Sequence, residues 1–364
     1  MTRYSPLHEK HRALAAKLAD FGGWEMPIEY PSGGVINEHT AVRENVGLFD
    51  VSHLGKAEVV GSDSLEFLNL ALTNDLDRIK DGQAQYTMLC DDASGGVVDD
   101  LIAYRKSSDE FLLIPNAANT AEVVKRLQAG AGNYKVTITN CHDKYGVLAV
   151  QGPNSSAILS QLGIDTNIEY MAFINARIGT AEVIVCRTGY TGERGFEILP
   201  KWSDTPAVWD QIAEKVNVAG GLICGLGARD TLRTEMGYPL HGHELSLEIT
   251  PVQASAGWAV GWKKERFWGK DFLSKERAAG ASRALRGLRL LERGIPRLGM
   301  TIQSGGDSVG VVTSGTFSPT LKCGIALGLI KPEIEIGSKV EIDVRGRLLS
   351  AEVTKPPFVA SKVK

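Results

Sequence analysis

A segment in the middle of the chain repeats, and this repeat limits the possible folds more than any other feature of the sequence. Residues 111–115 (FLLIP) form a short apolar run that ends at proline, and residues 196–200 (FEILP) repeat it 85 positions later. After each run, apolar residues recur with helical spacing, which predicts an amphipathic helix behind each strand. The first helix carries Val123, Val124 and Leu127 on one face, and the second carries Val208, Trp209, Ile212 and Val216.

A weaker similarity lies upstream of both runs, where residues 59–61 (VVG) and 150–152 (VQG) each precede another apolar helix pattern. Each half then has the order strand, helix, two or three strands, helix. That order is typical of a split β-α-β unit, in which helices cover one face of a mainly antiparallel sheet. We expect two such units over about residues 50–220. The matching residues are few, so chance similarity is the alternative.

The pattern changes after Gly269. Residues 339–345 alternate between apolar and charged side chains, as a half-buried strand does, and glycines supply turns between such strands. The sequence therefore predicts an α+β fold, with two split β-α-β (ferredoxin-like) units and a C-terminal all-β barrel or sandwich. We expect domains at residues 1–140, including an N-terminal segment, at 141–280 and at 281–364, and the first two could interleave.

Charge and apolar content exclude several classes of protein. The net charge of -3 gives no basic face of the kind that binds nucleic acid, and no apolar run approaches the roughly 20 residues of a membrane span. The N-terminus lacks the apolar core of a signal peptide, and Glu9 and Asp20 argue against a transit peptide. The five cysteines show no CxxC spacing, which favours free thiols over disulfides or a zinc site. We expect a cytoplasmic protein with no nucleic-acid or membrane partner.

Residues 93–104 (ASGGVVDDLIAY) combine a glycine turn with two adjacent acids. Because side chains alternate along a strand, Asp99 and Asp100 must point to opposite faces. We expect one of them to be solvated and the other to lie on the side of Ile102 and Tyr104, facing the interior or a cleft. A buried carboxylate is unfavourable unless it is paired or hydrogen-bonded, so such a position usually has a function. The alternative is that both aspartates only complete a hairpin turn.

Two further segments combine glycines with charged side chains. Residues 187–197 (RTGYTGERGFE) end at Glu197, whose carboxylate can accept two parallel hydrogen bonds from a planar, amidine-like edge. A flexible hairpin with a surface glutamate is the alternative. Residues 224–237 (CGLGARDTLRTEMG) predict a helix on which Arg229 and Arg233 share a face. No lysine follows the glycines in the manner of a P-loop, so an arginine that anchors a carboxylate or carbonyl is favoured over phosphate binding.

Two weaker patterns are interpreted as structural. His241 and His243 flank a glycine without further ligands nearby, so surface polar residues are favoured over a metal site. Ser52 and His53 are adjacent on an expected strand and would point to opposite faces, which argues against a nucleophile with its base.

Taken in order, these segments resemble the T-protein of the glycine cleavage system along nearly the whole chain. The matching runs are FGGW at 21–24, GLFDVSH at 47–53, SGGVVDDL at 94–101, QGP at 151–153, TGYTGE at 188–193, GLGARDTLR at 225–233, TSGTFSP at 313–319 and KPPFV at 355–359. Single runs are modestly specific, whereas the ordered set is highly specific. The resemblance implies a three-domain cloverleaf arrangement with a central folate cavity.

The resemblance also implies the activity, that of a tetrahydrofolate-dependent aminomethyltransferase in glycine catabolism and one-carbon metabolism. An aminomethyl group on the dihydrolipoyl arm of the lipoylated H-protein would pass to tetrahydrofolate, releasing ammonia and 5,10-methylenetetrahydrofolate. The H-protein is then the expected transient partner, with the P- and L-proteins as functional partners. Tetrahydrofolate is the expected one-carbon acceptor, and neither a metal nor a flavin is expected.

The resemblance assigns roles to particular residues of this chain. It implies that Asp100, the second aspartate of the SGGVVDDL run, is catalytic. It implies that Glu197 and Arg229 contact the folate ligand. Further positions that resemble folate-pocket residues are Tyr86, Asn116 and Tyr190.

The chain departs from the family at Leu54, where many members have methionine in a DVSHM run. A packing contact would survive this exchange at a cost usually below about 1.5 kcal/mol, whereas a role of the sulfur would not. A non-catalytic folate-binding relative of the iron–sulfur assembly and tRNA-modification group would carry a cysteine in its signature turn, which residues 189–193 lack. A free-standing demethylase of sarcosine, dimethylglycine or aryl methyl ethers shares the folate domain and stays an alternative. The oxidases among these relatives carry a fused flavin domain, for which this chain has no room.

Overall fold

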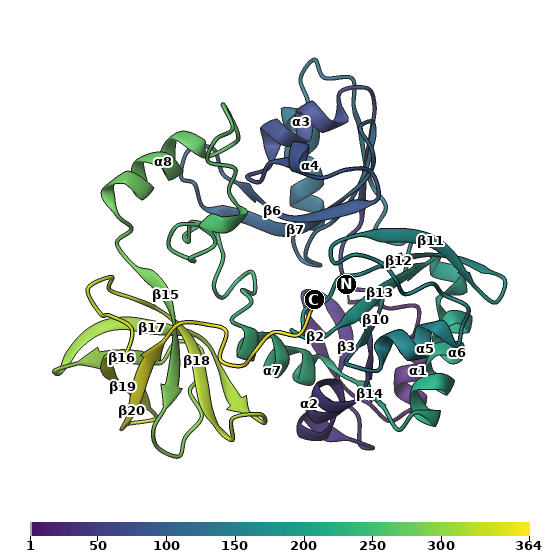
Figure 1. Cartoon of the computed structure of the whole chain (residues 1–364). Coiled ribbons are helices and arrows are strands. Elements are labelled where there is room, and N and C mark those ends of the chain that lie inside the picture. Colours follow the sequence, from purple (N-terminus) through teal and green to yellow (C-terminus); the bar gives the residue numbers. More distant parts are fainter. Residues whose placement is uncertain (1) are drawn as a thin grey trace.

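The computed structural model describes residues 2–364, which form two α+β units, an N-terminal segment and a β-barrel (Figure 1). The predicted fold class, with a closed barrel as its C-terminal part, is confirmed. Within residues 2–364, no helix has both the length and the apolar character that a membrane crossing requires. The division of the chain at residues 140 and 280 stays a prediction.

The first α+β unit is a five-stranded antiparallel sheet in the order β6-β7-β8-β5-β9. Helices α3 and α4 pack their apolar residues, including Phe67 and Leu127, against Leu101 and Ala103 of strand β7. Each such fully buried apolar side chain contributes about 1.5–3 kcal/mol. Its elements are β5 (Ala57–Val60), α3 (Ser64–Ala71), the 3-10 helix η1 (Leu76–Arg78), β6 (Gln83–Cys90), β7 (Val97–Ser107), β8 (Glu110–Ile114), α4 (Thr120–Gly130) and β9 (Thr137–Asn140).

The second α+β unit repeats this topology, which confirms the repeat expected from the sequence. Its sheet has the order β11-β12-β13-β10-β4-β14, and the first four positions match β6-β7-β8-β5 of the first unit. Strand β4 (Gly47–Asp50) precedes the first unit in the sequence, yet it lies between β10 and β14. The other elements are β10 (Leu148–Gln151), α5 (Ser155–Ser160), β11 (Phe173–Ile178), β12 (Ala181–Cys186), β13 (Gly195–Pro200), the 3-10 helix η2 (Trp202–Asp204), α6 (Thr205–Val218) and β14 (Leu222–Cys224).

The N-terminal segment packs against the second unit. The sequence patterns predicted no particular helices or strands for it. It contains a three-stranded sheet in the order β1-β3-β2 and two helices. Asp50, the last residue of β4, is fully buried and accepts hydrogen bonds from Ser5 Oγ and from His11 Nε2, the latter at 2.8 Å. The elements are β1 (Arg3–Tyr4), α1 (His8–Ala13), β2 (Lys17–Phe21), β3 (Trp24–Glu29) and α2 (Gly34–Glu44).

A linker segment, residues 238–269, connects helix α7 (Leu226–Met236) to helix α8 (Lys270–Ala279) and contains the 3-10 helix η3 (Gly257–Ala259). The linker crosses the start of β7 so closely that a Cβ atom on Gly96 would lie 1.9 Å from the carbonyl oxygen of Leu247. The backbone N–H of Val97 donates to the carbonyl of Ser246 at 2.7 Å. The second glycine of the SGGVVDD run is therefore required by backbone packing.

The C-terminal domain is a closed barrel of six strands in the order β15-β18-β17-β16-β19-β20. The expected alternation places Val340 and Ile342 of β19 inside the barrel with Leu288, Ile302 and Ala351. The C-terminal tail then returns past α7 to the second unit, where Lys362 N–H donates to the carbonyl of Gly192 at 2.7 Å. The strands are β15 (Ala284–Leu290), β16 (Thr301–Ser304), β17 (Asp307–Ser318), β18 (Cys323–Ile330), β19 (Lys339–Val344) and β20 (Arg347–Thr354).

Helix α7 is attached to the barrel by buried charged groups. Arg233 donates to Glu244 Oε2 of the linker segment at 3.0 Å and to Ser314 Oγ of β17 at 2.8 Å. Glu235 accepts hydrogen bonds from Ser318 Oγ and Thr320 Oγ1 of the barrel. Both side chains are almost completely excluded from solvent, so these contacts fix the barrel relative to α7.

Candidate functional site

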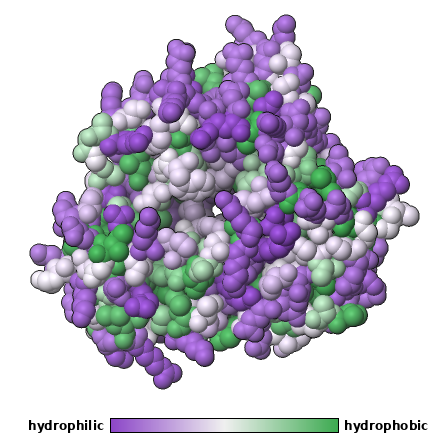
Figure 2. All heavy atoms as spheres, in the orientation of Figure 1, coloured by the Kyte–Doolittle hydropathy of each residue, from purple (hydrophilic) through white to green (hydrophobic). Residues whose placement is uncertain are grey.

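A central cavity of about 390 Å3 opens where the two α+β units, the loop after β4 and the linker segment meet. The face of the molecule in Figure 2 is hollowed near its centre. The volume lies in the usual range for small-molecule sites. The structure brings all six predicted site residues to this cavity: Tyr86, Asp100 and Asn116 from the first unit, Tyr190 and Glu197 from the second, and Arg229 from α7.

Asp100 lies on β7 with its carboxylate held on both sides. Tyr86 OH of the neighbouring strand β6 donates to Oδ2 at 2.9 Å, and Asn116 Nδ2 donates to Oδ1 at 2.9 Å. Burial raises the pKa of the Asp100 carboxyl, although the hydrogen bond from Tyr86 and the nearby His241 partly oppose the rise. A carboxylate with a raised pKa in a cavity is suited to accept a proton from a bound ligand or to stabilise a cation beside it.

Tyr86 is itself fixed by an aromatic neighbour. Its ring stacks on Trp258 of η3, with 5.2 Å between the ring centroids and an angle of 24° between the planes. Trp258 is 68 % exposed, which is unusual for tryptophan, and it also lines the cavity. It therefore offers a flat apolar surface at the rim of the cavity, next to the tyrosine that holds Asp100.

The expectation that one of the two adjacent aspartates is solvated is wrong. Asp99 is fully buried, and its carboxylate accepts hydrogen bonds from the backbone N–H of Asn116 and from Nδ2 of both Asn116 and Asn119. Alternation along β7 does turn the two side chains to opposite sides. However, the side opposite the cavity is covered by α4 and by the loop that precedes it, so neither direction leads to solvent.

Glu197 is partly buried on β13, and its carboxylate faces the cavity. Thr188 Oγ1 donates a hydrogen bond to Glu197 Oε2. Tyr104 OH lies 3.2 Å from the same threonine hydroxyl. The wall of the second unit thus presents a carboxylate with a fixed orientation, which is what recognition of a planar pair of N–H groups requires.

Arg229, on α7, contributes to the cavity a positive charge that has no ion-pair partner among the residues that the structure describes. Its guanidinium lies over the Tyr190 ring, 4.4 Å from the centroid, and it forms no ion pair within residues 2–364. Burial lowers the pKa of Arg229, while the nearby Tyr190 and Glu197 oppose this. An arginine in this state is available to a carboxylate or carbonyl group of a ligand.

The glycines that begin α7 have a packing role. A Cβ atom on Gly225 would lie 2.3 Å from the backbone carbonyl of Ile28 in β3, so glycine lets the start of α7 approach this strand. This close approach explains the glycines that resembled a phosphate-binding loop. It also sets the position from which Arg229, one turn further along, reaches the cavity.

The interpretation of His241 and His243 as surface polar residues is wrong. His241 Nε2 lies 3.0 Å from the carbonyl of Val97, and its Nδ1 lies 3.0 Å from Asn119 Nδ2. His243 Nδ1 lies 2.9 Å from the carbonyl of Thr313 in the barrel. The two histidines attach the linker segment to the first unit and to the barrel. Among the residues that the structure describes, no group of His, Cys, Asp and Glu side chains has the arrangement of a metal site.

The sequence patterns missed several residues of the cavity wall, among them His53 and Leu54 of the loop after β4. His53 is buried, and its Nδ1 has no hydrogen-bond partner within residues 2–364. Burial and the charge of Arg229 lower the pKa of His53 to about 3, so the imidazole is neutral near pH 7. The expectation that Ser52 and His53 lie on a strand is wrong, because β4 ends at Asp50 and both residues lie in the turn that follows. Ser52 nevertheless points away from the cavity, where its hydroxyl accepts from the backbone N–H of Val147. The GLFDVSH run was a signal for this wall only through the family resemblance.

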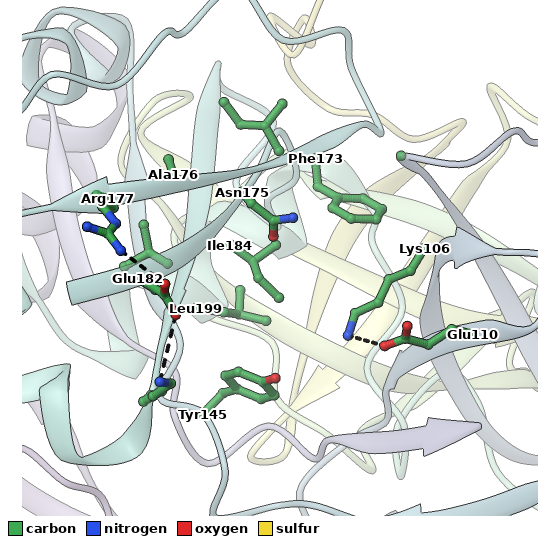
Figure 3. A pocket seen from close by; sticks show the side chains of 14 residues that line it. Lys106, Glu110, Tyr145, Phe173, Asn175, Ala176, Arg177, Glu182, Ile184 and Leu199 are labelled. Carbon is green, nitrogen blue, oxygen red and sulfur yellow. Dashed lines mark hydrogen bonds and ion pairs between the residues drawn. The ribbon is translucent and has the colours of Figure 1, made fainter. Parts of the chain in front are cut away.

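A second cavity, of about 840 Å3, lies between β7–β8 of the first unit and the β11–β12 hairpin of the second (Figure 3). Its charged side chains pair with one another: Lys106 with Glu110 at 2.7 Å, and Glu182 with Arg177 and Lys201 at 3.2 and 3.8 Å (Figure 3). None of the six predicted residues lines it. The central cavity, with its carboxylates and free guanidinium, is therefore the candidate site.

Comparison with known proteins gives matches over nearly the whole chain. Residues 7–264 match the family model described as the GCVT N-terminal domain, and residues 283–360 match the glycine cleavage T-protein C-terminal barrel domain. The aminomethyltransferase of Parafrankia sp. (strain EAN1pec) is 58 % identical, over 99 % of this chain and 98 % of that protein. That of Mycobacterium tuberculosis (strain ATCC 25618 / H37Rv) is 55 % identical, with the same coverage. The crystal structure of glycine cleavage system aminomethyltransferase T from Bartonella henselae superposes with a TM-score of 0.92 at 33 % identity, covering 100 % of this chain and 99 % of that one.

Proposed function

The chain belongs to the glycine cleavage T-protein family and is an aminomethyltransferase, and from this premise we propose its substrates and the roles of its residues. The one-carbon donor is the aminomethyl group on the dihydrolipoyl arm of the H-protein, and the acceptor is tetrahydrofolate. The products are ammonia, 5,10-methylenetetrahydrofolate and the reduced H-protein. The P- and L-proteins carry out the other steps of glycine cleavage.

The reaction rearranges bonds around a single methylene carbon. Its bonds to the amine nitrogen and to the lipoyl sulfur break, and bonds to N5 and N10 of tetrahydrofolate form. One of the two protons that leave the folate nitrogens converts the departing amino group into ammonia, and the other converts the departing lipoyl thiolate into a thiol. A protein that catalyses this exchange must align N5 with the carbon and assist proton transfer and the cationic intermediate stage.

We assign these tasks to residues of the central cavity. Asp100 orients the folate nitrogens and accepts a proton or stabilises the developing cation. Glu197 accepts two hydrogen bonds from the adjacent N–H and amino groups of the pterin, and Arg229 anchors a carbonyl or carboxylate of the folate. The observation that supports the proposal is that two carboxylates and an unpaired guanidinium line one cavity of about 390 Å3.

Tyr86, Asn116 and Tyr190 complete the proposed folate pocket. The first two donate to the two oxygens of Asp100, so they hold the carboxylate in one orientation. The Tyr190 ring packs against the Arg229 guanidinium, and the Tyr190 hydroxyl donates to the carbonyl of Pro239. Leu54 contributes an apolar wall where many relatives have methionine.

We also propose that the enzyme works in the cytoplasm. All five cysteines are free thiols, and four of them are buried. Reduced thiols of this kind are typical of a reducing compartment.

The test is single-turnover release of ammonia from aminomethylated H-protein in the presence of tetrahydrofolate. Asp100→Asn should keep folate binding, measured by calorimetry, and lose turnover by about 10²–10⁴-fold. Asp109→Asn is the matched control, because Asp109 is exposed at the far end of the same β7–β8 hairpin. Near-wild-type turnover of Asp100→Asn would remove Asp100 from the mechanism. Methyl transfer from an aryl ether, without ammonia release from the H-protein, would favour a demethylase instead.

A further inference from the structure

Asp99 is a fully buried carboxylate that the proposed mechanism does not use. It has no ion-pair partner within residues 2–364, and three neutral N–H groups satisfy it instead. The distances are 2.9 Å from Asn116 N to Oδ2, 2.9 Å from Asn116 Nδ2 to Oδ1 and 2.7 Å from Asn119 Nδ2 to Oδ1. A charge without a cation in the interior is unfavourable, so its retention beside Asp100 calls for a structural or functional reason.

The two oxygens of Asp99 hold Asn116 at two points, one on its backbone and one on its side chain. This two-point contact fixes both the loop between β8 and α4 and the plane of the Asn116 amide. The same Nδ2 lies 2.9 Å from Asp100 Oδ1 and 3.0 Å from the Asp100 carbonyl oxygen. One amide group is therefore shared between the two adjacent carboxylates.

Asn119 extends the contact to the linker segment. Its Nδ2 donates to Asp99 and lies 3.0 Å from His241 Nδ1, and His241 Nε2 lies 3.0 Å from the carbonyl of Val97. Asp99 thus joins strand β7, the loop before α4 and the linker segment directly beneath the cavity. Side chains at such a junction have little freedom to change orientation.

We infer that Asp99 is a positioning residue for Asp100: it clamps Asn116, and the clamped amide holds the Asp100 carboxylate in the orientation that the reaction needs. This inference rests on the proposed function of the cavity. Asparagine at position 99 would fill the same volume, but its NH2 group would face the N–H donors of Asn116 or Asn119. At least one hydrogen bond would be lost, the Asn116 amide would turn, and the support of Asp100 would be lost with it.

A double-mutant cycle separates positioning from a general structural role. Asp99→Asn should lower kcat of the intact enzyme by about 10–100-fold, as expected when a reacting group is misplaced by around 1 Å, while KM for tetrahydrofolate changes less than about 3-fold. In the Asp100→Asn background the same substitution should change turnover less than about 2-fold, because the group that it positions is gone. The control Asp109→Asn should leave kcat unchanged in both backgrounds. An equal loss in both backgrounds, or a loss confined to KM, would overturn the inference.

A second measurement keeps the inference testable should Asp99→Asn fail to fold. Burial and the neighbouring Asp100 carboxylate raise the pKa of Asp99. The other titratable groups near this pair are Tyr86, Tyr190 and, beyond Asn119, His241. In enzyme with 13C-labelled aspartate carboxyls, the resonance that the conservative variant Asp99→Glu removes should titrate at lower pH in Asp100→Asn than in wild type.

The kinetic measurement and the carboxyl titration also distinguish a failure of this inference from a failure of the proposed function. Absence of ammonia release in the wild type would refute the proposed function, and the carboxyl titration would still test the contact between the two aspartates. A resonance of Asp99 that titrates at the same pH in wild type and in Asp100→Asn would show that the two carboxyl groups are not coupled, as contacts to one amide require, and the inference would fall with the enzyme fully active.

Discussion

Glu235 provides a test of how strongly the barrel is attached to α7 and the N-terminal segment. Its side chain is fully buried on α7, where it accepts hydrogen bonds from Arg43 Nη2 at 2.8 Å and from Thr320 Oγ1 at 3.0 Å. Ser318 Oγ of the barrel donates to the other oxygen, and His39 Nε2 lies 3.4 Å away. The carboxylate therefore joins the N-terminal segment, α7 and the barrel through charge-assisted hydrogen bonds.

The size of this contribution follows from the pKa of the group. Burial alone would raise the pKa of Glu235, but hydrogen bonds from His39 and Ser318 and the charges of His39 and Arg43 outweigh it and lower the pKa from 4.5 to about 2. At about 1.4 kcal/mol per pKa unit, this difference corresponds to roughly 3 kcal/mol of folding free energy. Because the pKa is depressed in the folded state, the stabilisation is complete above pH 4.5 and is lost as the pH falls toward 2.

We expect Glu235→Gln to lower the free energy of unfolding by about 3 kcal/mol at pH 7, since removing one partner of a buried ion pair typically costs about 3–5 kcal/mol. Arg43 keeps a second carboxylate, Glu193, at 3.1 Å, which favours the lower end of this range. The difference between variant and wild type should shrink as the pH falls from 4.5 to 3, because the unfolded wild type then binds a proton at Glu235 that the folded protein does not.

The assay is urea unfolding of wild type, Glu235→Gln and Glu333→Gln at a series of pH values from 7 to 3. Glu333 is exposed on the barrel, so its variant should stay within about 0.5 kcal/mol of wild type. Equal stability of Glu235→Gln and wild type at pH 7 would refute the reasoning. A loss that stays constant down to pH 3 would attribute it to packing rather than to the charge.

Three further predictions follow from contacts in and near the cavity. Tyr86→Phe removes the hydroxyl that donates to Asp100 but keeps the ring, so turnover should fall about 10-fold while calorimetric unfolding shows a stability change of about 1 kcal/mol. Gly96→Ala puts a Cβ atom 1.9 Å from the Leu247 carbonyl oxygen, so the free energy of unfolding, measured by denaturant titration, should fall by about 3 kcal/mol. An unchanged free energy of unfolding would mean that the linker segment is not packed against Gly96. The pKa of His53 is lowered to about 3, so its ring resonances should show no titration between pH 5 and 8 by NMR.

Much of the fold is local and could be predicted from the sequence. The repeat at residues 111–115 and 196–200 indicated two similar units, and the strand order confirms it. The alternation at residues 339–345 indicated the β-domain. Strand β4 could not be placed in the same way, because a strand of four residues carries no information about which distant strands it joins.

The candidate site shows the same limit. Periodicity established that Asp99 and Asp100 point in opposite directions, but it contains nothing about what covers each side of the sheet. The burial of Asp99 and the contacts of His241 depend on segments far away in the sequence. The sequence pattern singled out Asp100 and Glu197 as candidates, and the family resemblance assigned their roles, which stay predictions.

The place of β4 has a consequence for how the chain is made. Residues 47–50 leave the ribosome about 100 residues before β10 and still longer before β14, the two strands that β4 joins. At typical rates of synthesis, the nascent chain carries this apolar strand without its neighbours for about 5–20 s, while the unit at residues 57–140 can already fold beside it. We therefore expect β4 to be open to pairing with other chains during this interval, and a fragment that starts after residue 50 lacks the strand that joins the two parts of the second sheet.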